Sequence, residues 1–125
     1  MTGLTSGGYG LLMDDDIPTE WLRAVLPLAV LSAVAEEETY GYAVAQRLQT
    51  AGLGAVKGGT LYPVLNRLEA DGLLTSCWRE GVGGPGRKFF AATDAGRDHL
   101  QRRAAAWHTF TERAAGLFPD PRSTR

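Results

Sequence analysis

The chain has 125 residues, of which 44% are hydrophobic, enough for one small domain with a packed core. Its formal net charge of −1 does not by itself indicate a nucleic-acid partner. No apolar run reaches the roughly 20 residues of a membrane span, and the first residues lack the pattern of a signal peptide. The single Cys77 excludes an internal disulfide framework and a cysteine-based metal cluster. We therefore expect a cytoplasmic protein with no membrane association, no metal and no cofactor.

The first part of the chain is predicted to be a tail followed by a helix. Residues 1–16 are glycine-rich and then acidic, which is typical of a disordered tail. A helix is expected to begin at Pro18, and Pro27 is expected to kink or break it. Because this helix is apolar on two sides, it should pack between two partners, one of which can be another subunit. The main apolar face comprises Leu22, Val25, Leu26, Ala29, Val30, Ala33 and Val34, and the second face comprises Trp21, Leu28 and Leu31.

Two short helices are predicted next, after a polar turn over residues 36–39. The earlier one runs from about Gly41 to Thr50. The later one begins between Gly58 and Thr60, and Gly72 closes it as a left-handed cap. Its apolar positions follow the i, i+3, i+4, i+7 rule, so they share a buried face and leave the opposite face to the solvent. The buried residues are Leu61, Val64, Leu65 and Leu68, and the outward residues are Tyr62, Pro63, Asn66, Arg67 and Ala70.

A hairpin and a long helix complete the chain. Strands are predicted over residues 73–79 and 88–93, separated by a mobile glycine-rich loop over residues 80–86. Thr93 then caps a helix over residues 94–118. Apolar positions along this helix alternate spacings of four and three, which predicts a coiled-coil-like seam. The seam residues are Leu100, Ala104, Trp107, Thr111, Ala114 and Phe118.

This order of elements predicts a mainly α (α+β) fold, a winged helix-turn-helix over residues 17–93 with a dimerisation helix over 94–118 and a tail over 119–125. In that fold the third helix enters the major groove of double-stranded DNA. Between Gly41 and Arg113 the chain has ten Lys/Arg against six Asp/Glu, so a basic face can exist despite the neutral total. The residues expected at DNA are Tyr40, Lys57, Gly59, Thr60, Tyr62, Pro63, Asn66, Arg67, Arg87 and Lys88.

Three blocks of the sequence resemble those of PadR-type regulators. GTLYPVLNRLEADGLL at 59–74 resembles the recognition helix of that family, and YGYAV at 40–44 resembles the start of its second helix. GRKFFAATDAG at 86–96 resembles its wing exit and the entry to its last helix, although two phenylalanines replace the usual tyrosines and an alanine follows where a basic or polar residue is frequent. The resemblance spans about residues 18–118. It implies a homodimeric, ligand-responsive repressor that binds a near-palindromic operator.

The single closing helix resembles the short-form subgroup, in which this helix and the first one build the dimer. The resemblance implies a dimer interface of Leu22, Val25, Leu28, Leu100, Trp107, Thr111, Ala114 and Phe118. Multidrug-sensing members have a tryptophan in the middle of this helix that stacks planar aromatic ligands, and Trp107 matches it, although plain core packing is the alternative. By the same resemblance the ligand site would comprise Trp21, Ala24, Leu28, Leu31, Ala104, Trp107 and His108.

Two other classes of function fit the sequence less well than DNA binding. A winged-helix adaptor that binds only proteins is the alternative, and the amide and basic groups of Asn66, Arg67 and Lys57 argue against it. An enzyme is not expected, because no nucleophile lies in a pattern with a base. His99 and His108 are nine residues apart, too far for a helical metal-binding pair.

Overall fold

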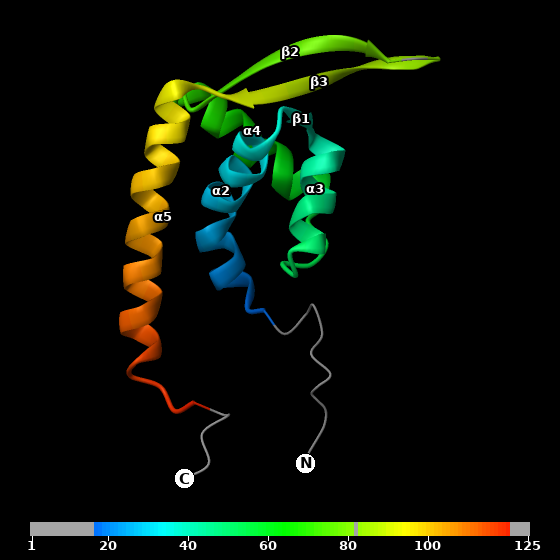
Figure 1. Ribbon diagram of the computed structural model, residues 1–125. Coiled ribbons are helices and arrows are strands. Elements are labelled where there is room, and N and C mark those ends of the chain that lie inside the picture. Colours follow the sequence, from blue (N-terminus) through cyan, green and yellow to red (C-terminus); the bar gives the residue numbers. More distant parts are fainter. Residues whose placement is uncertain (1–16, 82, 121–125) are drawn as a thin grey trace.

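The computed structural model describes residues 17–81 and 83–120, so the tail predicted over 1–16 and most of that over 119–125 lie outside the described residues. Figure 1 shows the order of the elements and a long last helix standing beside the others. This order confirms the predicted mainly α (α+β) winged-helix fold. The elements are α2 (Thr19–Glu36), β1 (Thr39–Tyr40), α3 (Gly41–Thr50), α4 (Gly58–Ala70), β2 (Leu74–Gly81), β3 (Gly84–Ala92) and α5 (Asp94–Ala115).

Helix α2 is the central element and contacts α3, α4, α5 and β3. It begins one residue later than expected, because Pro18 occupies the N-cap position, where its carbonyl accepts from the N–H groups of Trp21 and Leu22 at 3.0 and 3.1 Å. The helix is not broken at Pro27, which lies inside it. The proline removes only one backbone hydrogen bond, and burial of the helix on several sides maintains its path.

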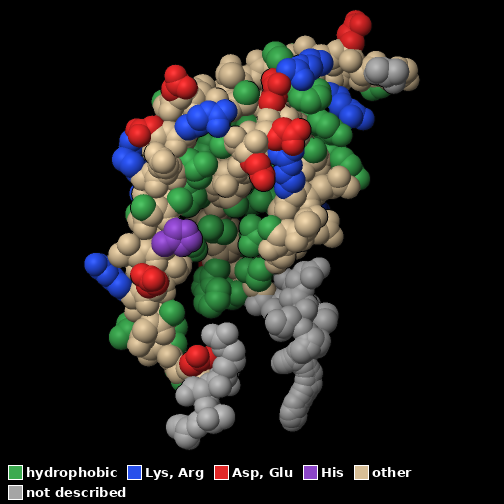
Figure 2. Space-filling model, in the orientation of Figure 1, with side chains coloured by type: hydrophobic (Ala, Val, Ile, Leu, Met, Phe, Trp, Pro, Cys, Tyr) green, Lys and Arg blue, Asp and Glu red, His purple; other side chains and the backbone are tan. Residues whose placement is uncertain are grey.

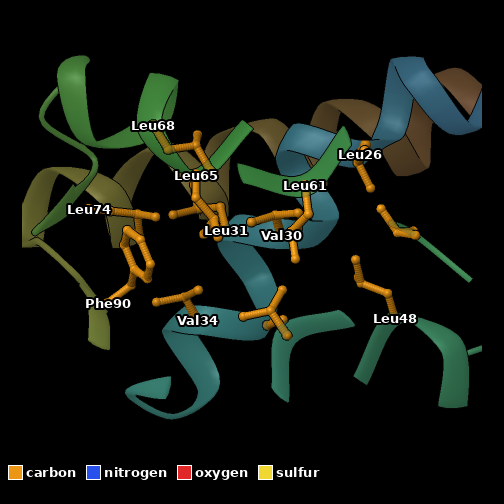
Figure 3. Close-up of a cluster of buried hydrophobic side chains, with 13 residues drawn as sticks. Leu26, Val30, Leu31, Val34, Leu48, Leu61, Leu65, Leu68, Leu74 and Phe90 are labelled. Atoms are coloured by element: carbon orange, nitrogen blue, oxygen red, sulfur yellow. The ribbon is translucent and has the colours of Figure 1, made fainter. Parts of the chain in front are cut away.

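The hydrophobic core lies where α2 meets α3, α4 and the sheet (Figure 3). From α4, the side chains of Leu61, Leu65 and Leu68 are buried as predicted, whereas Val64 is half-buried. Each such side chain stabilises the fold by roughly 1.5–3 kcal/mol on burial. This packing fixes the opposite face of α4 toward the solvent. The core residues are Leu26, Val30, Leu31, Ala33, Val34, Val44, Leu48, Val56, Leu61, Leu65, Leu68, Leu74 and Phe90.

The sheet has three antiparallel strands in the order β1-β3-β2. Thr39 was expected to end a polar turn, but it belongs to β1, in which Thr39 pairs with Phe90 and Tyr40 pairs with Phe89. The prediction of a loop over 80–86 is also wrong, because β2 continues to Gly81 and β3 begins at Gly84. The close pairing of β2 and β3 at their ends requires glycine at position 81, since a Cβ there would lie 2.7 Å from the Pro85 carbonyl oxygen.

The start of α5 is joined tightly to the segment that follows α4. Gly72 has the predicted left-handed conformation, with φ of 79°. The Thr93 hydroxyl donates to the Gly72 carbonyl at 2.7 Å and accepts from the Gly96 N–H at 2.9 Å, which confirms the predicted cap. The Thr93 N–H donates to the Leu73 carbonyl at 3.1 Å. A Cβ on Gly96 would lie only 2.0 Å from that carbonyl oxygen, so the approach requires glycine.

The end of α5 differs from the expectation of a helix through Phe118. The α-helix ends at Ala115, and the N–H groups of Leu117 and Phe118 bond three residues back, to Ala114 and Ala115. Tightening of the last turn to this spacing is common at helix ends, because it satisfies carbonyls that have no helical partner.

Candidate nucleic-acid interface

The exposed face of α4 and the β2–β3 hairpin border a groove of about 530 Å³. Five residues that were predicted to contact DNA meet there, and Tyr42 and Trp78 are additions that sequence reasoning missed. The indole of Trp78 is 71% exposed. The groove therefore combines four aromatic rings, one amide and two cations, and no carboxylate is among its lining residues. Its lining consists of Tyr40, Tyr42, Tyr62, Asn66, Trp78, Gly86, Arg87 and Lys88.

The N-terminus of α4 brings three further predicted residues to the surface. Lys57 occupies the N-cap position, and its carbonyl accepts from the N–H groups of Thr60 and Leu61, both at 2.9 Å. Lys57, Gly59 and Thr60 are all exposed. Because the first N–H groups of a helix have no intrahelical acceptor and carry partial positive charge, this end of α4 suits an anion.

Arg67 and Pro63 lie on the exposed side of α4 but do not line the groove. Pro63 lies inside α4, which begins at Gly58. The Arg67 guanidinium is 3.3 Å from a carboxylate oxygen of Asp71, with 79% of the arginine side chain exposed. An exposed ion pair of this kind contributes only about 0–1 kcal/mol, so Arg67 can exchange Asp71 for another partner.

Tyr62 is positioned by a close contact with the start of α3. A Cβ added to Gly41 would lie 2.3 Å from the Tyr62 hydroxyl oxygen and 2.6 Å from the adjoining ring carbon. The tyrosine ring therefore occupies the space that any other residue at position 41 would need. This contact explains why a glycine stands between Tyr40 and Tyr42.

Lys88 connects the hairpin to α4 through Glu69. The ammonium of Lys88 is 3.6 Å from one carboxylate oxygen of Glu69, and the Ser76 hydroxyl donates to the other at 2.6 Å. The lysine is therefore partly neutralised within the subunit, which sequence reasoning did not anticipate.

A second set of contacts joins arginine side chains of the hairpin to neighbouring aromatic rings. The Arg79 guanidinium is 2.6 Å from a carboxylate oxygen of Glu38, and this hydrogen bond raises the pKa of Arg79. Arg79 also lies 4.5 Å from the ring centroid of Phe89. The rings of Phe89 and Tyr40 are 5.3 Å apart, and the Arg87 guanidinium lies 4.5 Å from the Tyr40 ring centroid.

A separate cavity of about 430 Å³ lies between α2 and α5, and Figure 2 shows hydrophobic side chains in the hollow beside α5. Four residues of the predicted ligand site line it: Ala24, Leu28, Leu31 and Trp107. The other three predicted residues, Trp21, Ala104 and His108, are not among its lining residues. The cavity is completed by Val25, Pro27, Leu68, His99, Arg103, Ala106 and Phe110.

The predicted dimer seam lies on one side of α5. Five of its residues are half-buried in the single subunit, whereas Phe118 is exposed beyond the end of the helix. Trp21, Phe110 and Leu117 are large apolar side chains that the subunit also leaves exposed. The half-buried seam residues are Leu100, Ala104, Trp107, Thr111 and Ala114.

The described part of the chain has neither a membrane-spanning helix nor a cluster of potential metal ligands. None of its helices combines the length and hydrophobicity needed to cross a bilayer. Residues 17–81 and 83–120 also contain no group of three or more His, Cys, Asp or Glu side chains arranged to hold a metal ion.

Comparison with known proteins agrees with the resemblance in the sequence. A family model described as the transcriptional regulator PadR-like family matches residues 30–102. Transcriptional regulator Rv3488 of Mycobacterium tuberculosis is 46% identical over 87 residues, which cover 68% of this chain and 79% of that protein.

Solved structures of PadR regulators have the same fold. The PadR family transcriptional regulator from Eggerthella lenta is 37% identical with a TM-score of 0.71, covering 78% of this chain and 85% of that one. The PadR-like transcriptional regulator from Bacillus cereus is 28% identical, also with a TM-score of 0.71, covering 79% of this chain and 96% of that one. From the family match and these likenesses it follows that this chain belongs to the PadR-like family of transcriptional regulators.

Proposed function

We propose that this regulator binds a specific double-stranded DNA sequence through α4 and the β2–β3 hairpin. The observation that supports this most directly is the groove beside α4, which presents an amide, two cations and aromatic rings without a lining carboxylate. A helix fits the major groove, where asparagine pairs well with adenine and arginine with guanine. The proposed contact surface comprises Tyr40, Lys57, Gly59, Thr60, Tyr62, Pro63, Asn66, Arg67, Arg87 and Lys88.

Within this surface, different residues are suited to different parts of the DNA. The N-terminus of α4, with Lys57 and Thr60, suits a phosphate. Asn66 and Arg67 project from the exposed side of the helix, where side chains can reach base edges. The hairpin places Arg87 at the edge of the same groove.

The test is to select duplexes from a random library with the wild-type protein and measure their binding by fluorescence anisotropy. Asn66→Ala and Arg67→Ala should each weaken binding by about 1–3 kcal/mol and relax the base preference at one position. Arg102→Ala is a matched control, because Arg102 also pairs with the residue four positions away but lies on α5. If both α4 variants bind the selected DNA as the wild type does, the assignment is wrong and a protein-binding adaptor becomes the better explanation.

The proposed active form is a homodimer built from α2 and α5. Its support is the large apolar surface that one subunit leaves exposed, with Trp21 at 65%, Phe110 at 61% and Leu117 at 83% exposure. Apolar patches of this kind usually mark an interface. Twofold symmetry would present two α4 helices to successive major grooves of a near-palindromic operator. The proposed interface includes Leu22, Val25, Leu28, Leu100, Trp107, Thr111, Ala114 and Phe118.

The proposed effector site is the cavity between α2 and α5. Trp107 lines it, and the ring of Phe110 lies 5.8 Å from that of Trp107, so both can stack on a planar aromatic molecule. Such a ligand would favour one arrangement of the two subunits over another and thereby release DNA. The resemblance to PadR-type repressors supports the proposal that the protein represses transcription in the absence of the ligand.

A further inference from the structure

Two arginines face each other on the hairpin, and only one of them is neutralised. Arg79 of β2 and Arg87 of β3 are direct cross-strand partners. Like charges in that position repel each other. Glu38 offsets the charge of Arg79 through a 2.6 Å contact, whereas within residues 17–81 and 83–120 no carboxylate forms an ion pair with Arg87. The pair therefore presents one available cation.

Both guanidinium groups are stacked on aromatic rings. Arg79 lies 4.5 Å from the centroid of Phe89, and Arg87 lies 4.5 Å from the centroid of Tyr40. Both distances are within the roughly 6 Å over which a cation is attracted to an aromatic face. The two rings are 5.3 Å apart and tilted by 58°, so the four side chains form one continuous series, which we call the arginine–aromatic stack.

Strand β1 places Tyr40 in this stack. Its two residues pair with β3, so that Tyr40 is opposite Phe89, which is two residues after Arg87 and on the same face of the strand. Tyr40 and Arg87 also line the groove that contains Tyr62 and Asn66 of α4. The end of the stack therefore opens on the surface that the proposed function assigns to DNA.

We propose that Tyr40 is a positioning residue, whose ring holds the Arg87 guanidinium at the groove in readiness for a DNA phosphate. A long side chain that is already ordered loses less conformational freedom on binding than a free one. Phe89 supports the Tyr40 ring from the other side, and Glu38 keeps Arg79 from repelling Arg87. The inference rests on the proposed binding of DNA by the hairpin.

The experiment is a double-mutant cycle on duplex DNA selected by the wild-type protein, with anisotropy measured at several salt concentrations. Arg87→Ala should weaken binding and lower the slope of log K against log salt by about 0.9, as expected for one phosphate contact. Tyr40→Leu should weaken binding about 2- to 5-fold, the range expected for an exposed cation–π contact. In the Arg87→Ala background, Tyr40→Leu should have no further effect. Tyr40→Phe, which retains the ring, should retain the coupling, so that Arg87→Ala weakens binding by the same factor in this background as in the wild type.

Tyr42→Leu is the matched control, because Tyr42 lines the same groove but Arg87 stacks on the ring of Tyr40 instead. Its effect should be equal in both backgrounds. Thermal unfolding of each variant checks the fold, and Phe89→Leu replaces Tyr40→Leu in the cycle if the latter does not fold.

Three results would overturn the inference. If Tyr40→Leu weakens binding equally with and without Arg87, the ring does not act through the arginine. If Tyr40→Phe loses the coupling as Tyr40→Leu does, the hydroxyl is the important group. If the wild type selects no duplex at all, the proposed function fails first, and this inference fails with it.

Discussion

Replacing Gly96 with alanine should destabilise the protein, although alanine normally favours a helix. In the interior of an exposed helix, a change from glycine to alanine stabilises by roughly 0.5–1 kcal/mol. At Gly96, however, the new Cβ would lie 2.0 Å from the Leu73 carbonyl oxygen, whereas real Cβ atoms essentially never come within 3.0 Å of such an atom. The start of α5 must therefore move away by about 1 Å.

That movement would disturb the hydrogen bonds that join α5 to the end of α4. The Thr93 hydroxyl bridges Gly72 and Gly96 with contacts of 2.7 and 2.9 Å, and the Thr93 N–H bonds to Leu73. Overpacking of this kind costs about 1–3 kcal/mol, more than the gain in helix propensity. We expect the midpoint of thermal unfolding to fall by roughly 4–8 °C for each kcal/mol lost.

Gly116→Ala provides a control at the other end of the same helix. There a Cβ would be 3.5 Å from the nearest atoms, an ordinary contact, and the backbone is right-handed. This variant should unfold at or slightly above the wild-type temperature. Both proteins are compared at equal concentration by circular dichroism, since association shifts the midpoint. An unchanged or raised midpoint for Gly96→Ala would refute the argument.

Three further predictions concern the subunit interface, the cavity and the hairpin. The intact protein should sediment as a dimer at micromolar concentration, because a monomer would leave Phe110 and Leu117 in water; a stable monomer would contradict this. Planar aromatic dyes should quench tryptophan fluorescence in the wild type but much less in Trp107→Ala, with dimerisation unchanged in the variant. If that variant dissociates and the wild type binds no dye, Trp107 is a packing residue. Lys88→Ala should lower the salt dependence of DNA binding less than Arg87→Ala does, since Glu69 already offsets part of the lysine charge; equal reductions would show that the contact with Glu69 is lost on binding.

The helices could be predicted from the sequence because each has a clear apolar period. The pattern of Leu61, Leu65 and Leu68 was sufficient to identify which side of α4 is buried. Strand β1 could not be found in the same way, since two residues are too few to show a period. Its partners in β3 are about fifty positions away, so the pairing of Tyr40 with Phe89 is a tertiary contact with no local signal. The contact between Arg87 and Tyr40 depends on that pairing.

Trp78 and the cavity show two different reasons for missed residues. The position of Trp78 could have been predicted, because Leu74, Ser76 and Trp78 alternate along β2 and therefore share one face of the strand. The side of α5 that borders the cavity was harder to predict. The predicted seam shares Trp107 with the cavity, but the other α5 side chains that line the cavity, at positions 99, 103, 106 and 110, are not in the seam.

The orientation of α5 follows from the Gly96 contact. Positions 99, 103, 106 and 110 continue from Gly96 in steps of three and four, so they lie on the same side of the helix as the glycine that touches Leu73. The seam residues Leu100, Ala104, Trp107, Thr111 and Ala114 are half-buried, whereas Arg103, Ala106 and Phe110 are exposed, so the apolar period did identify the more buried side of the helix. Trp107 belongs both to that side and to the cavity lining.

The joint at Thr93 and Gly96 also makes α5 a lever arm for α4, the helix that we propose binds DNA. With 22 residues, α5 is about 33 Å long at 1.5 Å per residue, so a tilt of about 5° at the joint displaces its far end by about 3 Å. Conversely, a displacement of that size at the far end rotates the joint by only a few degrees. The joint is fixed to the residues directly after α4. A displacement of the distal half of α5 would therefore turn the end of α4 by only a small angle, and the core contacts of α4 need not change.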